Sequence, residues 1–84
     1  MKRRIDFKVH TNNEFGIGLA ERKAHLGNDP EETFMNIWKS LPKRLDKQWW
    51  MIEFEFEGEL FSMPRDTFRE TRFDFWSSIE REVA

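Results

Sequence analysis

The chain has 84 residues, with 14 lysine and arginine residues against 16 acidic residues and a formal net charge of −2 at pH 7. This length predicts a single domain spanning residues 1–84, and so small a chain buries only about 60–65% of the surface that its extended form exposes. The sequence contains no cysteine, which excludes disulfides, thiolate nucleophiles and cysteine-based zinc sites.

The hydrophobic core must rest on aromatic residues, because the chain has nine Phe and four Trp. No apolar run approaches the roughly 20 residues that span a bilayer, so we expect no membrane partner. The first four residues are basic like the start of a signal peptide, but the mixed segment 5–8 follows them instead of an apolar stretch. Together with the lack of cysteine, this predicts a cytoplasmic protein.

A period of two in the apolar residues predicts two initial strands, Arg3–His10 and Glu14–Ala20, joined as a hairpin. A three-residue loop at 11–13 would pair Val9 with Phe15 and bring the apolar side chains of both strands onto one face. The next segment, 21–28, is polar, and we expect it either to extend the second strand or to form a loop.

Residues 29–32, Asp-Pro-Glu-Glu, predict the start of a helix, because Asp29 can cap it and proline suits the first helical position. Pro42 is expected to end or kink this helix near residues 39–41. A short basic stretch follows at 43–47. One helical face carries the apolar residues Phe34, Trp38, Leu41 and Leu45.

The clearest pattern in the chain is QWWMIEFEFEGELFSM at residues 48–63. Its alternation predicts a half-buried strand that turns back at Glu57-Gly58 into a second strand, with Phe54 opposite Phe61. Strict alternation places one set of side chains in the core, namely Trp50, Ile52, Phe54 and Phe56. The other set lies on the opposite face and comprises Trp49, Met51, Glu53, Glu55 and Glu57.

The segment from Pro64 to Val83 has apolar residues at helical spacing and predicts one final helix, with Phe73 about 60° outside the apolar arc. The predicted order is therefore ββαββα. We expect an α+β fold in which a four-stranded antiparallel sheet packs two helices on one face. The other face would be open and would carry Lys8 with the acidic residues of the third strand.

Catalysis is not expected, because the two histidines, His10 and His25, lie in no nucleophile, base or metal-ligand motif. The Gly16-Ile17-Gly18 segment lacks the third glycine of a phosphate-binding loop, which is replaced by Glu21. The sequence thus predicts a protein that is not an enzyme and that binds neither a metal nor another cofactor.

The acidic row Glu53, Glu55, Glu57 and Glu59 has a spacing of about 7 Å, near that of nucleic-acid phosphates. We therefore expect it to fit a basic groove on a larger protein, such as a nucleic-acid-binding protein; a solvated face or a charged edge that prevents aggregation is the alternative. The candidate binding residues are completed by three apolar side chains, Trp49 as an anchor, Met51 and Phe73. Coverage of Trp49 by the loop at 43–47 is the alternative to its exposure.

Charge is unevenly distributed, since residues 1–48 carry ten basic and seven acidic residues and residues 49–84 carry four and nine. An alternative function is therefore a small nucleic-acid-binding accessory protein. A homodimer that buries the open face or an unpaired edge strand is a second alternative. The basic candidates are Lys2, Arg3, Arg4, Arg22, Lys23, Lys43 and Arg44.

In its size, its lack of cysteine and its aromatic content, the chain resembles the small α+β proteins that phages and mobile elements encode against host defences, such as anti-restriction and anti-CRISPR proteins. The resemblance covers composition and size. It implies a small inhibitor or adaptor that blocks a larger protein by binding it.

Overall fold

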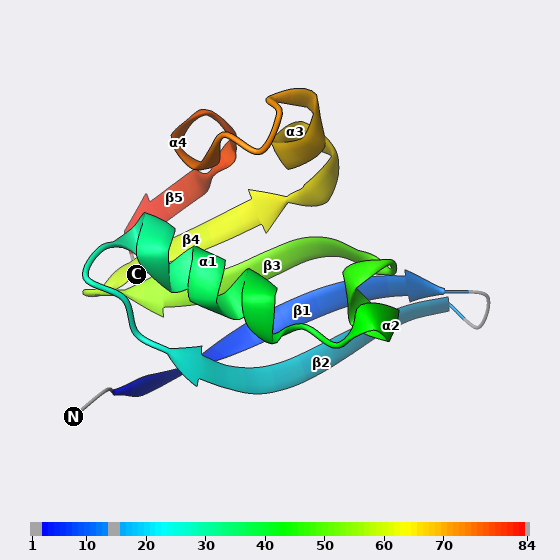
Figure 1. Cartoon of the computed structure of the whole chain (residues 1–84), viewed down its shortest axis with the longest axis horizontal. Coiled ribbons are helices and arrows are strands. Elements are labelled where there is room, and N and C mark those ends of the chain that lie inside the picture. Colours follow the sequence, from blue (N-terminus) through cyan, green and yellow to red (C-terminus); the bar gives the residue numbers. More distant parts are fainter. Residues whose placement is uncertain (1–2, 14–15, 84) are drawn as a thin grey trace.

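In the part of the chain that the structure describes, five strands form a single antiparallel sheet in the order β2-β1-β3-β4-β5, and four short helices accompany it (Figure 1). The computed structural model describes residues 3–13 and 16–83. The strands are β1 (Arg4–Asn13), β2 (Gly16–His25), β3 (Trp49–Phe56), β4 (Glu59–Pro64) and β5 (Glu80–Val83). The helices are α1 (Pro30–Ser40), α2 (Lys43–Asp46), α3 (Arg65–Glu70) and α4 (Phe75–Ser78).

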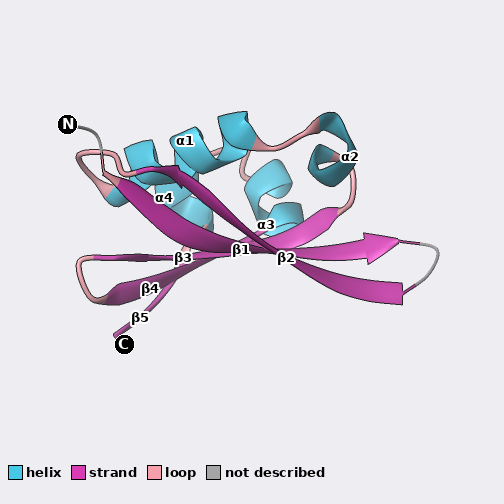
Figure 2. Cartoon of the chain, turned by 90° about the horizontal axis from the view of Figure 1, so that it is seen from below, coloured by secondary structure: helices cyan, strands magenta, loops and turns pink. Residues whose placement is uncertain are grey.

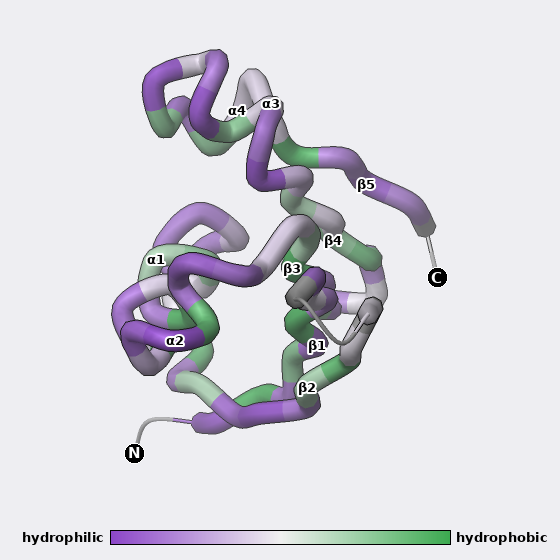
Figure 3. Tube along the Cα trace, turned by 90° about the vertical axis from the view of Figure 1, so that its right-hand side faces the viewer, coloured by the Kyte–Doolittle hydropathy of each residue, from purple (hydrophilic) through white to green (hydrophobic). Residues whose placement is uncertain are grey.

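All of these helices lie on one side of the sheet, and its other side is uncovered by any described element (Figure 2). Viewed nearly along the strands, the sheet curves from β2 to β5 with α1 and α2 on its helix side (Figure 3). The predicted α+β class and antiparallel sheet are confirmed. The prediction of four strands and two helices is wrong, because the basic stretch at 43–47 contains the short helix α2 and the last predicted helix is two short helices followed by a strand.

The helix predicted for residues 64–83 is interrupted at Arg72 and Phe73, whose φ angles are 59° and 67°. The Phe73 N–H donates to the Phe68 carbonyl at 2.8 Å, and the Arg72 N–H donates to the Arg69 carbonyl at 3.1 Å. This is the Schellman arrangement that ends a helix, and the accompanying apolar contact is made by the rings of Phe68 and Phe73. Beyond it the chain returns to the sheet, where β5 pairs with the edge of β4 that would otherwise be unpaired.

The first hairpin is longer than the sequence predicts. Val9 pairs with Ala20 and Ile5 with Ala24, and residues 11–13, which were predicted to form the loop, pair with residues 16–18. The predicted partner of Val9, Phe15, falls outside the described residues. Segment 21–25 extends the second strand, which gives β1 a ladder of ten residue pairs. Ala24 is buried where α1 packs on β2, because a small side chain lets the helix approach the sheet closely.

The β3–β4 hairpin follows the prediction, with Phe54 opposite Phe61 and Ile52 opposite Met63. Its two turn residues, Glu57 and Gly58, have φ angles of 51° and 78°. Two positive φ angles define the turn whose twist matches that of the flanking strands, and glycine adopts this conformation without steric cost.

The start of α1 also follows the prediction. Asp29 is its N-cap and accepts a hydrogen bond from the Glu32 N–H at 2.7 Å, with Pro30 in the first turn. The helix ends at Ser40, before Pro42. Its buried residues Phe34 and Ile37 face the sheet, and Phe34 stands at the centre of the aromatic core between β3, α3 and α4.

Gly27 leads into this helix through a close contact that only glycine allows. Its N–H donates to the buried Thr33 hydroxyl at 2.8 Å, and a Cβ at this position would lie 2.6 Å from the Thr33 nitrogen. Gly27→Ala should therefore destabilise the fold by about 1–3 kcal/mol, because backbone must move to make room. Urea denaturation measures this, with exposed Asn28→Ala as the control. Equal stability of the two variants would contradict the contact.

Candidate functional site

The uncovered side of the sheet, called the open face below, presents side chains from every strand. The register of the four strand pairs fixes its members, because directly paired residues point to the same side. Residues of the open face are Arg4, Asp6, Lys8, His10, Asn12, Leu19, Glu21, Lys23, His25, Trp50, Met51, Glu53, Glu55, Leu60, Ser62, Pro64, Glu80 and Glu82.

Charge on the open face is segregated. Its cationic residues Arg4, Lys8 and Lys23 all lie on β1 and β2, where carboxylates accompany them. The half formed by β3, β4 and β5 carries four carboxylates and, among the described residues, no lysine or arginine. This half, called the acidic half below, comprises Glu53, Glu55, Glu80 and Glu82.

The predicted acidic row is divided by the structure. Glu53 and Glu55 lie on the open face, and Glu57 lies in the turn. Glu59 pairs with Phe56 and so points to the helix side, where its carboxylate is 3.7 Å from Nε of Arg81. The acidic half therefore gains two members from β5 in place of Glu57 and Glu59. Sequence reasoning missed Glu80 and Glu82 because it assigned them to a helix.

A β-bulge overturns the predicted orientation of the two adjacent tryptophans. His10 pairs with Met51 and Thr11 pairs with Trp49, which leaves Trp50 as the extra residue. The alternation shifts by one at this point, so Trp49 is buried with 3% exposure and Trp50 is 44% exposed. The assignment of Trp49 as an exposed anchor is thus wrong, and the exposed ring next to Met51 belongs to Trp50.

Trp49 is held on the helix side by Arg65. The Arg65 guanidinium lies 5.6 Å from the centre of the Trp49 ring, and its Nη1 donates to the carbonyls of Lys47 and Trp49. The ladder continues past the bulge, because the Asn12 N–H donates to the Gln48 carbonyl at 2.9 Å. The pairing of β1 with β3 therefore continues on both sides of the bulge, which is an ordered part of the sheet.

On the open face the Trp50 ring lies against His10, with ring centres 5.3 Å apart. Nε2 of His10 is 2.8 Å from Oε1 of Glu53 and donates to this carboxylate, and both side chains are about four-fifths buried. The cluster fixes the orientation of an exposed tryptophan. Preorganised aromatic rings of this kind are the usual anchors of protein interfaces.

Leu19 lies next to His10 in the sheet and is 54% exposed. With Trp50 and the half-buried Met51 it forms an apolar end of the open face, at the end of the sheet away from the Glu57-Gly58 turn. This apolar end borders the acidic half through Glu53. An apolar centre with a charged rim is the common composition of protein interfaces.

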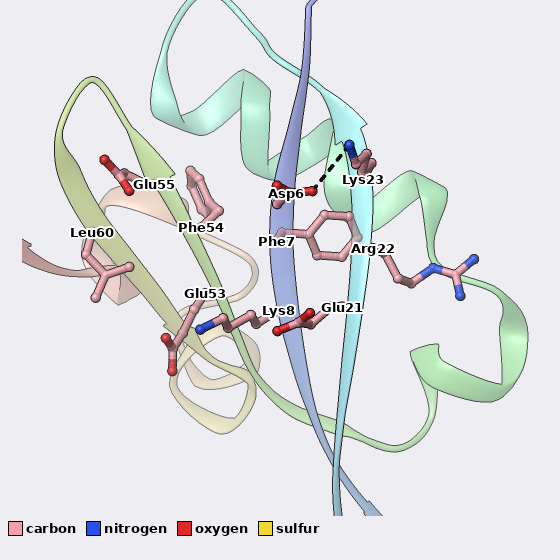
Figure 4. Close-up of a pocket in the computed structure, with 10 residues that line it drawn as sticks. All are labelled: Asp6, Phe7, Lys8, Glu21, Arg22, Lys23, Glu53, Phe54, Glu55 and Leu60. Carbon is pink, nitrogen blue, oxygen red and sulfur yellow. Dashed lines mark ion pairs between the residues drawn. The ribbon is translucent and has the colours of Figure 1, made fainter.

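A hollow of about 560 Å³ crosses the open face beside this apolar end (Figure 4). Lys8 extends across it toward Glu53, and an ion pair of 3.8 Å joins Asp6 to Lys23. Glu55 and Leu60 line its other side. The hollow is open to solvent, and its charged lining is mixed, with four carboxylates and the basic side chains of Lys8, Arg22 and Lys23.

Phe73 lies on the helix side of the molecule rather than on the open face. It is 57% exposed and stacks on Trp38 with ring centres 5.7 Å apart. It therefore cannot act in the same contact as Glu53 and Glu55. The structure explains its exposure by the helix end described above, where its backbone conformation turns the ring outward from the core.

The predicted basic surface is not assembled on one side. Arg4 and Lys23 belong to the open face, whereas Arg22 points to the side where Phe7 points (Figure 4). Lys43 and Arg44 are exposed on α2, on the helix side. Arg3 is exposed just before β1, and Lys2 lies outside the described residues.

His10 and His25 lie near opposite ends of the first hairpin, since His25 pairs with Arg4. Within residues 3–13 and 16–83, no group of three or more histidine, aspartate or glutamate side chains is arranged to hold a metal ion. In the same part of the chain, no helix has the length and apolarity needed to cross a membrane.

Comparisons of the chain with protein-family models, with curated proteins and with solved structures found no match.

Proposed function

We propose that the protein is a non-enzymatic binding module that attaches to, and blocks, a larger protein through its open face. The observation that carries the proposal is the pairing of a preoriented, exposed Trp50 with four carboxylates on the adjoining half of an uncovered sheet. The partner that fits has a basic surface next to an apolar pocket. A protein that binds nucleic acid is one source of such a surface.

Charge complementarity would act mainly on the rate of association. Exposed carboxylates steer a basic partner toward the open face, while burial of an aromatic anchor sets how long the complex lasts. Blocking, as opposed to mere binding, is supported by the small size of the chain and by its resemblance to anti-defence proteins. A cytoplasmic location remains part of the proposal.

The test reverses two charges that have no structural partner among the described residues. Glu55 and Glu82 flank Leu60 across β3, β4 and β5 and are exposed. Glu53 is left unchanged because it accepts a hydrogen bond from His10. We expect Glu55→Lys with Glu82→Lys to leave the fold intact and to abolish the capture of a stoichiometric protein partner from host lysate.

The matched control is Glu31→Lys with Glu70→Lys, which makes the same change in net charge at exposed positions on helices α1 and α3. It should capture the partner as the unmodified protein does, and nuclease treatment should not alter the result. Recovery of nucleic acid alone, or loss of binding in both double variants, would overturn the proposal.

A further inference from the structure

The outer edge of β2 is long and unpaired. β2 spans ten residues and lies at one end of the sheet, whereas the opposite edge strand, β5, spans four. In Figure 1 β2 runs along the margin of the molecule. In the described ranges, no other strand pairs with this edge. Such an edge is a template for strand addition, and short or covered edges are the usual protection.

The hydrogen-bond pattern shows which backbone groups of β2 face outward. The Leu26 N–H donates to the Arg3 carbonyl at 2.7 Å, so even-numbered residues of β2 bond to β1 and odd-numbered residues point away from it. The His25 carbonyl also points outward, but it already accepts a hydrogen bond from the side chain of Asn36 in α1. The outward set therefore includes Leu19, Glu21 and Lys23.

The charged side chains beside these backbone groups are complementary to those of a second copy of β2 that runs antiparallel to the first. Glu21 and Lys23 are both exposed and both belong to the open face, with Arg22 between them. If β2 pairs with β2 of a second copy about a two-fold axis at Arg22, each Glu21 stands directly opposite Lys23 of the other copy. This register makes two cross-strand pairs of opposite charge, and it lets the outward backbone groups exchange hydrogen bonds.

We propose that the protein forms a two-fold dimer by antiparallel pairing of its β2 edges, centred on Arg22. A shift of the axis to Glu21 would replace both opposite-charge pairs by a repulsive pair of carboxylates, so the register centred on Arg22 has the more favourable charge pairs even though Arg22 then faces its own copy. In the selected register Ala20 meets Ala24 of the second copy on the helix side, where both are small enough to permit close packing.

The dimer would join the two sheets into one of ten strands. Because the axis is perpendicular to the sheet, both open faces lie on the same side, and the acidic halves lie at the two outer ends. The proposal does not depend on the proposed function, since the dimer uses backbone groups and residues of β2 rather than the acidic half.

Charge reversal in the full chain, measured by sedimentation equilibrium from micromolar to submillimolar concentration, tests the register. Glu21→Lys should weaken dimerisation by roughly tenfold or more, because the two-fold axis makes the change count twice. Lys23→Glu should have the same effect, and the double charge swap should restore the dimer. Glu80→Lys on the opposite edge strand is the control and should leave dimerisation unchanged.

In the same register Arg22 stands opposite Arg22 of the second copy, and this contact between like charges is repulsive. Arg22→Ala should therefore strengthen the dimer, an effect opposite in sign to that of the two neighbouring charge reversals. The result would be a lower dimer dissociation constant with unchanged thermal stability at concentrations where the chain is monomeric.

Cross-linking provides a second readout, because the chain has no cysteine of its own. Paired residues that do not exchange hydrogen bonds have Cα atoms about 4.5 Å apart, within the range that a disulfide spans. Arg22→Cys should form a dimeric disulfide under mild oxidation, whereas Leu19→Cys on the same strand should not, since the two Leu19 positions lie about 20 Å apart in this register. A monomer at all concentrations, or faster cross-linking of Leu19→Cys, would overturn the proposal.

Discussion

Phe34→Ala should remove a large fraction of the protein's free energy of unfolding. Phe34 is fully buried, and its ring contacts those of Phe54, Phe68 and Phe75 with centre distances of 5.3 to 6.4 Å. Removing a buried phenylalanine ring costs about 3–5 kcal/mol, because the cavity left behind collapses only in part. A domain of this size has a total stability of only about 4–13 kcal/mol, so the loss is a large fraction of it.

Urea denaturation followed by circular dichroism measures this loss, and Trp76→Ala is the matched control. Trp76 is also aromatic, but it is 50% exposed, contacts the core through Phe75 and otherwise lies against the exposed guanidinium of Arg81. Its removal should cost about 1 kcal/mol or less. A Phe34→Ala variant as stable as Trp76→Ala would contradict the placement of the core.

The parts of the fold that sequence reasoning predicted correctly are those with strong local signals. Asp29 and Pro30 mark a helix start by side-chain capping and a fixed φ angle, and both positions are as expected. The β3–β4 hairpin is also correct, because its turn has a glycine at the second of its two positive φ angles and its apolar residues alternate.

The C-terminal segment was predicted wrongly because its apolar spacing fits a helix equally well. Phe68 and Phe75 are both buried, as a single helix would also require, but they are buried from two separate short helices. The break at Arg72 and Phe73 places two positive φ angles on residues that rarely adopt them, so no residue type signals it. β5 pairs with the otherwise open edge of β4, and this pairing is a long-range feature that the local pattern does not indicate.

This error also affected the candidate binding surface. Glu80 and Glu82 lie on the acidic half only because β5 joins the sheet, and Glu59 is removed from it by the register of β4. The sequence identified an acidic strand face, and its third-strand members Glu53 and Glu55 are where the alternation places them. The complete set of carboxylates depends on strand pairing, which local patterns do not determine.

The first hairpin shows the same limit. Apolar matching favoured a short pairing of the two strands, with Leu19 in the core, whereas Leu19 is 54% exposed on the open face. The longer register adds the polar segment 21–25 to β2 and places Ala24 under α1. Its extra ladder hydrogen bonds and the contact with α1 outweigh the burial of one leucine, and neither can be read from the period of the strand alone.

Trp49→Ala and Trp50→Ala should have opposite consequences, although the two residues are adjacent. Trp49 is buried against Arg65, so its removal should destabilise the fold by about 3–5 kcal/mol. Trp50 is 44% exposed beside His10, so its removal should cost about 1 kcal/mol or less and should instead weaken binding to the proposed partner.

Urea denaturation of both variants, together with partner capture by the Trp50→Ala variant, separates these roles. Strict alternation along β3 predicts the reverse order of stability, since it buries Trp50 and exposes Trp49. The bulge opposite His10 is what exchanges the two side chains. A more unstable Trp50→Ala variant would therefore show that the bulge is absent, and the apolar end of the open face would then lose its anchor.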